Sequence, residues 1–229
     1  MSRWPLLLCS IVVAGCSDLT EGAGGAVGLE IQEPADKRIE IGQTLQLSAS
    51  AIDKDGNPVG APVEWRSADP TLSVDANGVI TGVAAGQGRV QAFTGSLSSQ
   101  VLTFTVIVRA DTLVVVGDSV VTVAPGVTSS APLVVQTRTF VPDDPLPGRD
   151  VIYGVTSPPD VGPHTVELTG GVLTDTLTTG TPDGTVTAVT LNRVNGTAQP
   201  DTAIVTVIAP RPHGDPVAGS GQRFLVVFQ

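Results

Sequence analysis

The apolar residues of this chain recur at every second position in short runs, and no window carries a 3.6-residue apolar period long enough for a helix. Of the 18 prolines, 13 lie after residue 108, nearly all of them between these runs. Short alternating runs separated by turn residues predict an all-β chain and are typical of β-sandwiches. The 229 residues are enough for one large domain or two small ones.

The charge balance restricts the kinds of partner. The chain carries 22 acidic and 12 basic side chains, a net charge of −10. No basic stripe is present that could displace counterions from phosphates, so the composition argues against nucleic-acid binding. The same balance argues against electrostatic docking on anionic lipid.

The N-terminus has the pattern of a secretory signal peptide. Arg3 supplies a positive charge, an apolar run follows from Pro5 to Ala14, and small residues precede Cys16. Ten helical residues would reach about 15 Å, half of a bilayer's hydrocarbon core, so this segment is too short to span a membrane. We therefore expect residues 1–15 to be a leader that is removed.

The sequence Val13-Ala-Gly-Cys16 resembles the lipobox of bacterial lipoproteins. The resemblance implies that Cys16 is acylated, becomes the first mature residue and anchors the chain in a membrane. Ser17, which is not Asp, favours the outer membrane under the enterobacterial sorting rule. Because Cys9 leaves with the leader, the mature chain would have no thiol for a disulfide or a metal site. The alternatives are an ordinary signal peptide and a cytosolic start.

The mature chain is expected to have three parts. Residues 16–27, which include several glycines, are typical of a flexible tether. Residues 28–108 and 109–229 are expected to form two β-sandwiches in tandem.

The first of these parts resembles a known family. The segments VEWRSADP (63–70), VDANGVITGVAAG (74–86) and VQA (90–92) are similar to the bacterial Ig-like domain of group 2. This module is repeated in invasin- and intimin-type adhesins. The resemblance covers residues 28–108 and implies an Ig-like β-sandwich in a surface or envelope protein.

Several residues in this resemblance have expected structural roles. Trp65 is expected to fill the space between the two sheets. Gly78, Gly82 and Gly86 are expected to supply backbone dihedrals that other side chains forbid. Asn77-Gly78 also predicts a hairpin turn between two apolar runs.

The second part weakly resembles group 1 bacterial Ig-like modules, through the segments Pro182–Val186 and Pro216–Ser220. Its alternating runs predict nine strands, at 112–116, 120–124, 133–139, 151–155, 165–168, 172–177, 186–191, 203–207 and 224–228.

One motif raises the possibility of catalysis. Gly117-Asp-Ser119 follows an apolar strand and resembles the nucleophile block of GDSL-type esterases. That chemistry needs a base and an oxyanion hole, and the family uses a D-x-x-H motif near the C-terminus. His213 has no Asp three residues before it, and His164 has Asp160 four residues before it. A β-turn at Ser119 is therefore favoured, and an esterase remains a remote alternative.

An acidic segment in the first part is a candidate metal site. Asp53, Asp55, Asn57 and Glu64 follow positions 1, 3, 5 and 12 of an EF-hand loop, but Pro58 replaces the required glycine. A turn is favoured over a weak Ca²⁺ site.

A second acidic loop, with Asp143, Asp144 and Asp150, allows the same two interpretations. The two histidines are too few for a zinc site without thiols. No cofactor is expected.

These patterns leave two main hypotheses for function. The first is a non-enzymatic, lipid-anchored adhesion or surface-interaction module whose partner is a protein or a glycan. The second is a periplasm-facing structural or assembly lipoprotein with the same fold. Fold analogy alone does not separate them.

Overall fold

The computed structural model describes residues 25–157, 164–194 and 202–229, and the expected leader and Cys16 lie outside these ranges. The named elements of the described residues are all β-strands, as the alternation predicts. None of these residues forms a helix long and apolar enough to cross a membrane. The strands of the first part are β1 (Gly28–Ile31), β2 (Arg38–Glu40), β3 (Thr44–Gln46), β4 (Ala49–Ile52), β5 (Pro58–Val59), β6 (Glu64–Ser67), β7 (Leu72–Val74), β8 (Val79–Gly82), β9 (Gly86–Thr94), β10 (Leu97–Ser98) and β11 (Leu102–Ile107).

The first sandwich consists of three sheets around one core. Their orders are β1-β4-β5, β3-β8-β7 and β10-β9-β11-β2, and β6 also pairs with β9. Strand β2 runs parallel to β11, whereas the other pairs are antiparallel. The core includes Ile39, Leu47, Leu72, Ile80 and Phe104. Ala26, which the sequence assigned to the tether, is also fully buried in this core.

The chain changes sheets between β3 and β4 while its inward face stays the same. Strand β3 pairs with β8, and β4 pairs with β1. Leu47 and Ala51 are nevertheless both buried, and Ser48 and Ser50 between them are exposed. The predicted alternation is thus confirmed across the crossover, because both sheets enclose the same core.

The second sandwich follows a short linker. Its strands are β12 (Thr112–Val115), β13 (Val120–Val123), β14 (Val135–Arg138), β15 (Asp150–Ser157), β16 (Val166–Leu168), β17 (Thr174–Thr178), β18 (Thr185–Val186), β19 (Leu191–Arg193), β20 (Thr202–Ile208) and β21 (Gln222–Phe228). They form the sheets β12-β14-β18, β13-β21-β20-β15-β17 and β16-β19. A second, separate core lies among them and includes Leu113, Tyr153, Leu168, Val205 and Phe224.

One predicted strand is wrong. The run from Val186 to Leu191 was expected to be a single strand, but β18 ends at Val186 and β19 begins at Leu191. Val186, Val189 and Leu191 are all buried, so the burial does not alternate. Strand β18 pairs with β14, whereas β19 pairs with β16, and the chain between them leaves one sheet for another.

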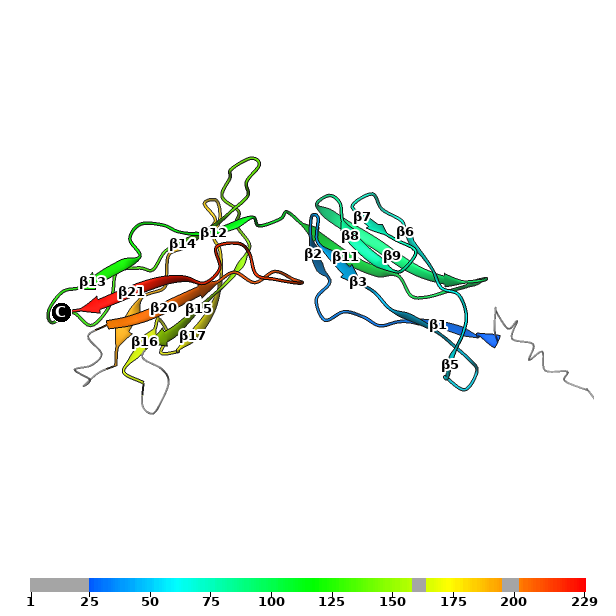
Figure 1. Cartoon of the computed structure of the whole chain (residues 1–229), viewed down its shortest axis with the longest axis horizontal. Helices are drawn as coiled ribbons and strands as arrows, with labels where there is room; N and C mark the ends of the chain where they lie inside the picture. The colour runs from blue at the N-terminus through cyan, green and yellow to red at the C-terminus, as the bar shows by residue number, and fades with distance from the viewer. Residues whose placement is uncertain (1–24, 158–163, 195–201) are drawn as a thin grey trace, which may run out of the picture.

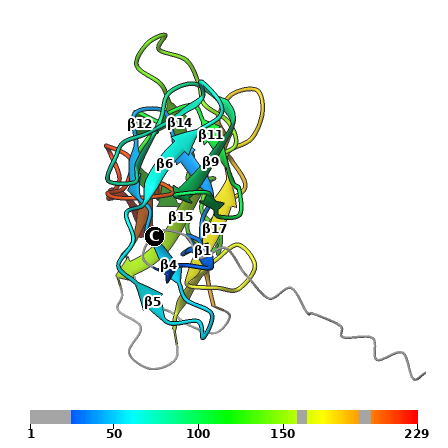
Figure 2. The ribbon, with the colours of Figure 1, turned by 90° about the vertical axis from the view of Figure 1, so that its right-hand side faces the viewer.

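The two sandwiches lie end to end (Figure 1). Strand β1 is at the outer end of the first sandwich, and the C-terminus is at the opposite end of the molecule. Figure 2 looks along this long axis and shows the first sandwich in front of the second. The junction between them is formed by β2, the linker after β11 and the loop between β20 and β21.

The three glycines that were expected to adopt special dihedrals differ in their structural roles. Gly78 and Gly86 have positive φ angles of 83° and 141°. Gly82 does not have a positive φ, so the dihedral role expected for it is wrong. A Cβ at Gly82 would instead lie 2.5 Å from the carbonyl oxygen of Glu40, and the close approach of two strands excludes a side chain there.

Trp65 lies beside Gly78 at the margin of the first core. It is partly buried and packs against the core residues without being enclosed by them. A Cβ at Gly78 would lie 2.7 Å from the indole ring, so the ring occupies the space that a side chain at Gly78 would need.

Candidate functional site: the domain junction

Glu40, the last residue of β2, is a charged residue buried at the junction. Its side chain is only 1% exposed. Strand β2 runs parallel to β11 with Ile107 opposite Glu40, which aims the carboxylate at the linker that follows β11. The Ala110 N–H donates to Glu40 Oε1 at 3.2 Å. The first sandwich thereby holds the start of the second through a side chain.

Two arginines of the second sandwich complete the environment of Glu40. Arg211, in the loop between β20 and β21, donates from Nη1 to Glu40 Oε2. Arg149, just before β15, places Nε 3.8 Å from Oε1 and donates from Nη2 to the Val108 carbonyl. A buried carboxylate is costly unless it is paired and hydrogen-bonded. The two arginines therefore make the burial of Glu40 possible.

Burial also affects Arg149 itself. Loss of solvent lowers the pKa of its guanidinium, and the charge of Glu40 opposes this shift. An arginine has so high an intrinsic pKa that it stays protonated under physiological conditions. The Arg149 guanidinium is therefore a permanent positive charge at the junction.

An outer pair lies beside this cluster. Arg38 Nη1 lies 3.5 Å from Asp150 Oδ2, so β2 and β15 are also linked. Both side chains are at least one-third exposed, and such pairs contribute little to stability.

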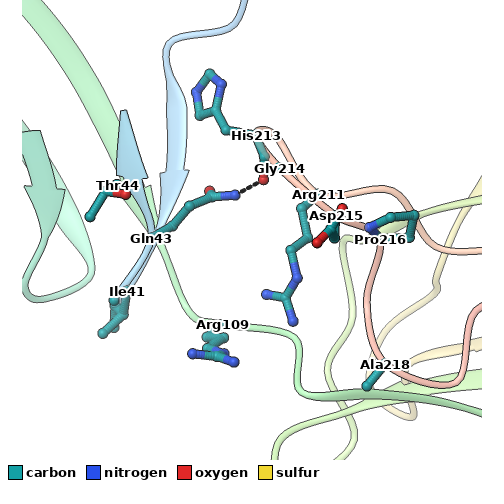
Figure 3. Close-up of a pocket in the computed structure, with 11 residues that line it drawn as sticks. Ile41, Gln43, Thr44, Arg109, Arg211, His213, Gly214, Asp215, Pro216 and Ala218 are labelled. Atoms are coloured by element: carbon teal, nitrogen blue, oxygen red, sulfur yellow. Dashed lines mark hydrogen bonds between the residues drawn. The ribbon is translucent and has the colours of Figure 1, made fainter. Parts of the chain in front are cut away.

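Gln43 provides a second contact between the sandwiches. Its Oε1 accepts the Glu40 N–H at 3.1 Å, and its Nε2 donates to the His213 carbonyl. Figure 3 shows the amide of Gln43 extended towards the loop that carries His213 and Gly214. One amide therefore binds the backbones of both sandwiches.

A cleft of about 460 Å³ lies beside these contacts. Gln43 and Thr44 line it from the first sandwich, Arg109 from the linker, and Arg211 and Asp215 from the second sandwich (Figure 3).

The cations of this cleft already have partners. Arg211 pairs with Glu40, and Arg109 Nε lies 3.1 Å from Asp111 Oδ1. His213 Nε2 is buried and has no hydrogen-bond partner among the residues that the structure describes. The arrangement can fix the orientation of two domains, and the described lining residues show no nucleophile hydrogen-bonded to a base.

Comparison with known families decides the identity of the first sandwich. Residues 32–106 match the model of the bacterial Ig-like domain (group 2). The first sandwich is a bacterial Ig-like domain of group 2. The resemblance seen in the sequence is thereby confirmed for this part of the chain. Comparison with the curated proteins gave no match.

Several solved structures are similar to this chain. Domains 4 and 5 of the S-layer protein SbsC share 16% identity at a TM-score of 0.32, over 89% of this chain and 98% of that one. The adhesin InvE of Yersinia pseudotuberculosis shares 18% sequence identity at a TM-score of 0.40, and the match covers 88% of this chain and 58% of that one. The fibronectin(III)-like modules of Clostridium thermocellum CbhA share 18% sequence identity at a TM-score of 0.41. The match covers 88% of this chain and 94% of that one.

Within the group 2 domain, the weak Ca²⁺ candidates Asp53, Asp55 and Asn57 form a turn. Asp53 Oδ1 accepts the N–H groups of Asp55 and Asn57, both at 2.9 Å. These backbone hydrogen bonds lower the pKa of the Asp53 carboxyl group, and the bond from Asn57 has the largest effect. The Asn57 side chain turns its amide nitrogen, not its oxygen, towards Asp53. Glu64 pairs with Arg66 in β6.

In the second acidic loop, two of the three aspartates pair with arginines. Asp143 pairs with Arg138 at 2.8 Å, and Asp150 pairs with Arg38. Among the described residues, no three His, Cys, Asp or Glu side chains are grouped as metal ligands.

The esterase motif does not assemble with a histidine. Ser119 is exposed between β12 and β13, and its carbonyl accepts the Leu225 N–H at 2.8 Å. His164 lies 3.9 Å from Glu167, and His213 lies at the domain junction. Within the described ranges, the Ser119 hydroxyl has no hydrogen bond to either histidine. Asp160 lies outside these ranges.

Sequence reasoning did not find the Glu40 cluster. Its only local signal is an acidic residue between two isoleucines, Ile39 and Ile41, in a short strand. Nothing in the surrounding residues indicates that the partner is Arg211, between two prolines near the C-terminus.

Proposed function

We propose that this chain is a non-enzymatic, lipid-anchored protein of the bacterial cell envelope whose tandem Ig-like sandwiches form an adhesion or surface-interaction module. The observation that carries the proposal is the group 2 domain at residues 32–106, preceded by a lipobox-like sequence ending at Cys16. Acyl chains on Cys16 would hold the chain in the membrane, since each buried CH₂ contributes about 0.8 kcal/mol.

The arrangement of the sandwiches supports this role. An anchor at Cys16 precedes β1, which is at the end of the molecule opposite to the C-terminus (Figure 1). The group 2 domain would then act as a spacer that holds the second sandwich away from the membrane. The buried pair of Glu40 and Arg211 favours one orientation of the two domains over a freely jointed tandem.

Anchoring is tested by labelling growing cells with an analogue of palmitate. The proposal predicts label on the wild-type protein and none on the Cys16→Ala variant. Equal labelling of the two proteins, or label on neither, contradicts a lipid anchor at Cys16.

Exposure on the cell surface is tested by protease treatment of intact cells, followed by immunoblotting for residues 110–229. Loss of the second sandwich from intact cells, with retention of a periplasmic control protein, is the expected result. Protection until the outer membrane is opened contradicts the surface role and favours the periplasm-facing structural lipoprotein. Cys16→Ala serves as the unanchored control.

The non-enzymatic assignment has a direct test at the esterase motif. Ser119→Ala is expected to leave the hydrolysis of model esters at the background rate of the wild type. A loss of hydrolysis in this variant contradicts the assignment.

A further inference from the structure

The loop between β14 and β15 presents two apolar side chains to solvent. Phe140 is 61% exposed and Val141 is 92% exposed. Of the other four phenylalanines, three are buried and Phe93 is partly buried. The loop projects from the second sandwich towards the top of both views (Figures 1 and 2). We call Phe140 and Val141 the loop tip.

The loop tip is held in place by its own hydrogen bonds. The Phe140 N–H donates to Asp111 Oδ2 at 2.9 Å, and the Thr139 N–H donates to the Asp144 carbonyl at 2.9 Å. Arg138 Nε donates to Asp143 Oδ1 at 2.8 Å. An ordered loop loses little conformational entropy when it binds, so an exposed apolar tip of this kind is suited to contact a partner.

The surroundings of the tip indicate the chemistry of that partner. Asp143 and Asp144 follow the tip after Pro142, and both are exposed. Asp143 pairs with Arg138, whereas Asp144 has no ion pair with any described residue. A complementary surface would therefore be an apolar depression with a cationic rim.

The group 2 domain carries such a depression. A groove of about 240 Å³ beside β6 and β9 includes Val90, Phe93 and Val101 in its lining, and Arg66 and Arg89 line it as well. That volume corresponds to the space of about eight water molecules in the liquid. Val101 is 51% exposed, so part of the apolar lining faces solvent.

The polar groups in this groove are largely satisfied within the domain. Ser67 donates to the carbonyls of Asp69 and Leu72, and the Gln91 amide donates to the Ser99 carbonyl. The groove therefore needs no polar ligand to satisfy these two side chains, and an apolar occupant fits it better.

Arg66 supplies a charge that can be redirected. Its guanidinium lies 4.6 Å from the centre of the Phe93 ring, and its side chain is 64% exposed. Its ion pair with Glu64 is equally exposed, and such pairs are worth about 0–1 kcal/mol. An incoming carboxylate can compete with Glu64 at little cost.

We propose that the loop tip of one copy of this chain inserts into the Arg66–Phe93 groove of a second copy, with Asp144 facing Arg66. The tip and the groove are different surfaces, so the contact is heterologous, and such contacts build either closed rings or open rows of copies. The contact is small and therefore weak. It rests on the proposed function for its setting, because anchoring in one membrane would raise the local concentration of copies.

The test uses the full chain in detergent solution and two single variants. Val141→Asp places a charge in the apolar tip, and Val101→Glu places a charge in the groove. Both positions are exposed, so neither change disturbs a core. Val127→Asp and Val83→Glu are control variants, because these valines are 50% and 51% exposed and neither belongs to the loop tip or lines the groove.

Sedimentation velocity over a wide concentration range is the measurement. The wild type and both controls are expected to show a sedimentation coefficient that rises with concentration. Each single variant is expected to lose this rise. A mixture of the two variants should recover part of it, since the intact tip of one still fits the intact groove of the other.

Three results would overturn the inference. They are a wild type that stays monomeric throughout, variants that associate like the wild type, and a mixture that behaves as the sum of its parts. Each leaves the proposed function standing, because that depends on palmitate labelling and on protease access. Conversely, a protein protected inside the cell can still pass the sedimentation test.

Discussion

Arg211, between β20 and β21, donates a hydrogen bond to Glu40 in β2, although 171 positions separate the two residues in the chain. Their side chains are 13% and 1% exposed. The pair joins the group 2 domain to the second sandwich where solvent is largely excluded. Its loss should therefore be felt by both domains.

Glu40→Gln is expected to loosen the junction, because it removes the buried carboxylate that Arg211 and Arg149 face. Breaking a buried ion pair by changing one partner costs about 3–5 kcal/mol. Urea unfolding is the measurement, with Trp65 fluorescence reporting on the first sandwich and Tyr153 on the second. Trp4 lies in the expected leader, so Trp65 is the only tryptophan of the expected mature chain. Two separate transitions are expected in the variant at lower urea than in the parent.

Glu64→Gln is the matched control for this experiment. Glu64 pairs with Arg66 at 3.2 Å, but its side chain is 70% exposed. Exposed pairs contribute about 0–1 kcal/mol, so this variant should unfold almost like the parent. Equal shifts in the two variants would show that the buried charge does not hold the sandwiches together.

The local features of the fold could be predicted from the sequence. The Asn77-Gly78 turn joins β7 and β8 with Val74 opposite Ile80, as expected for a hairpin of this length. The alternation that buries Leu47 and Ala51 was also visible. Both follow from the two-residue period of a strand and from turn chemistry, which depend on neighbouring residues only.

The features that the sequence did not predict depend on residues far away in the chain. Gly82 is required by the approach of the Glu40 backbone, and no dihedral signal marks such a position. The break after Val186 arises because the chain leaves β14 for β16, which the apolar pattern does not encode. The Glu40 cluster is the extreme case, since its partners come from a different domain.

Gly78→Ala is expected to destabilise the group 2 domain for two reasons. Gly78 has a φ of 83°, where an alanine costs about 1–2 kcal/mol. A Cβ there would also lie 2.7 Å from the Trp65 ring, so the ring must move. The free energy of unfolding, measured by urea titration with Trp65 fluorescence, should fall and the emission should shift.

Gly56→Ala separates these two effects. Gly56 has nearly the same φ, 82°, but a Cβ there meets no atom within 4 Å. The Gly56→Ala variant should therefore lose only the part of the stability that comes from backbone conformation, and the emission of Trp65 should stay unchanged. If the two variants lose the same stability, the contact between Gly78 and Trp65 carries no energetic weight.

Tyr153, the only tyrosine of the chain, predicts a loss of stability at alkaline pH. It is fully buried in the second core, and its hydroxyl donates to the Leu133 carbonyl at 3.0 Å. Burial raises the pKa of this hydroxyl above its ordinary value of about 10. The folded state therefore keeps the proton above pH 10, while the unfolded state releases it.

The sign of the effect follows from the proton count. Below about pH 10 both states hold the proton and the stability is unaffected. Above it the unfolded state binds fewer protons, so the free energy of unfolding falls by about 1.4 kcal/mol per pH unit until the folded pKa is reached.

Urea unfolding of wild type and Tyr153→Phe over a pH series measures this effect. The variant is expected to lose about 1–3 kcal/mol at neutral pH, because the Leu133 carbonyl is left without its donor. The difference between the two proteins should then shrink as the pH rises above 10, since only the wild type has this group to titrate. Absorbance of tyrosinate should appear together with unfolding. Its appearance near pH 10 in protein that is still folded would contradict the shifted pKa and the burial that causes it.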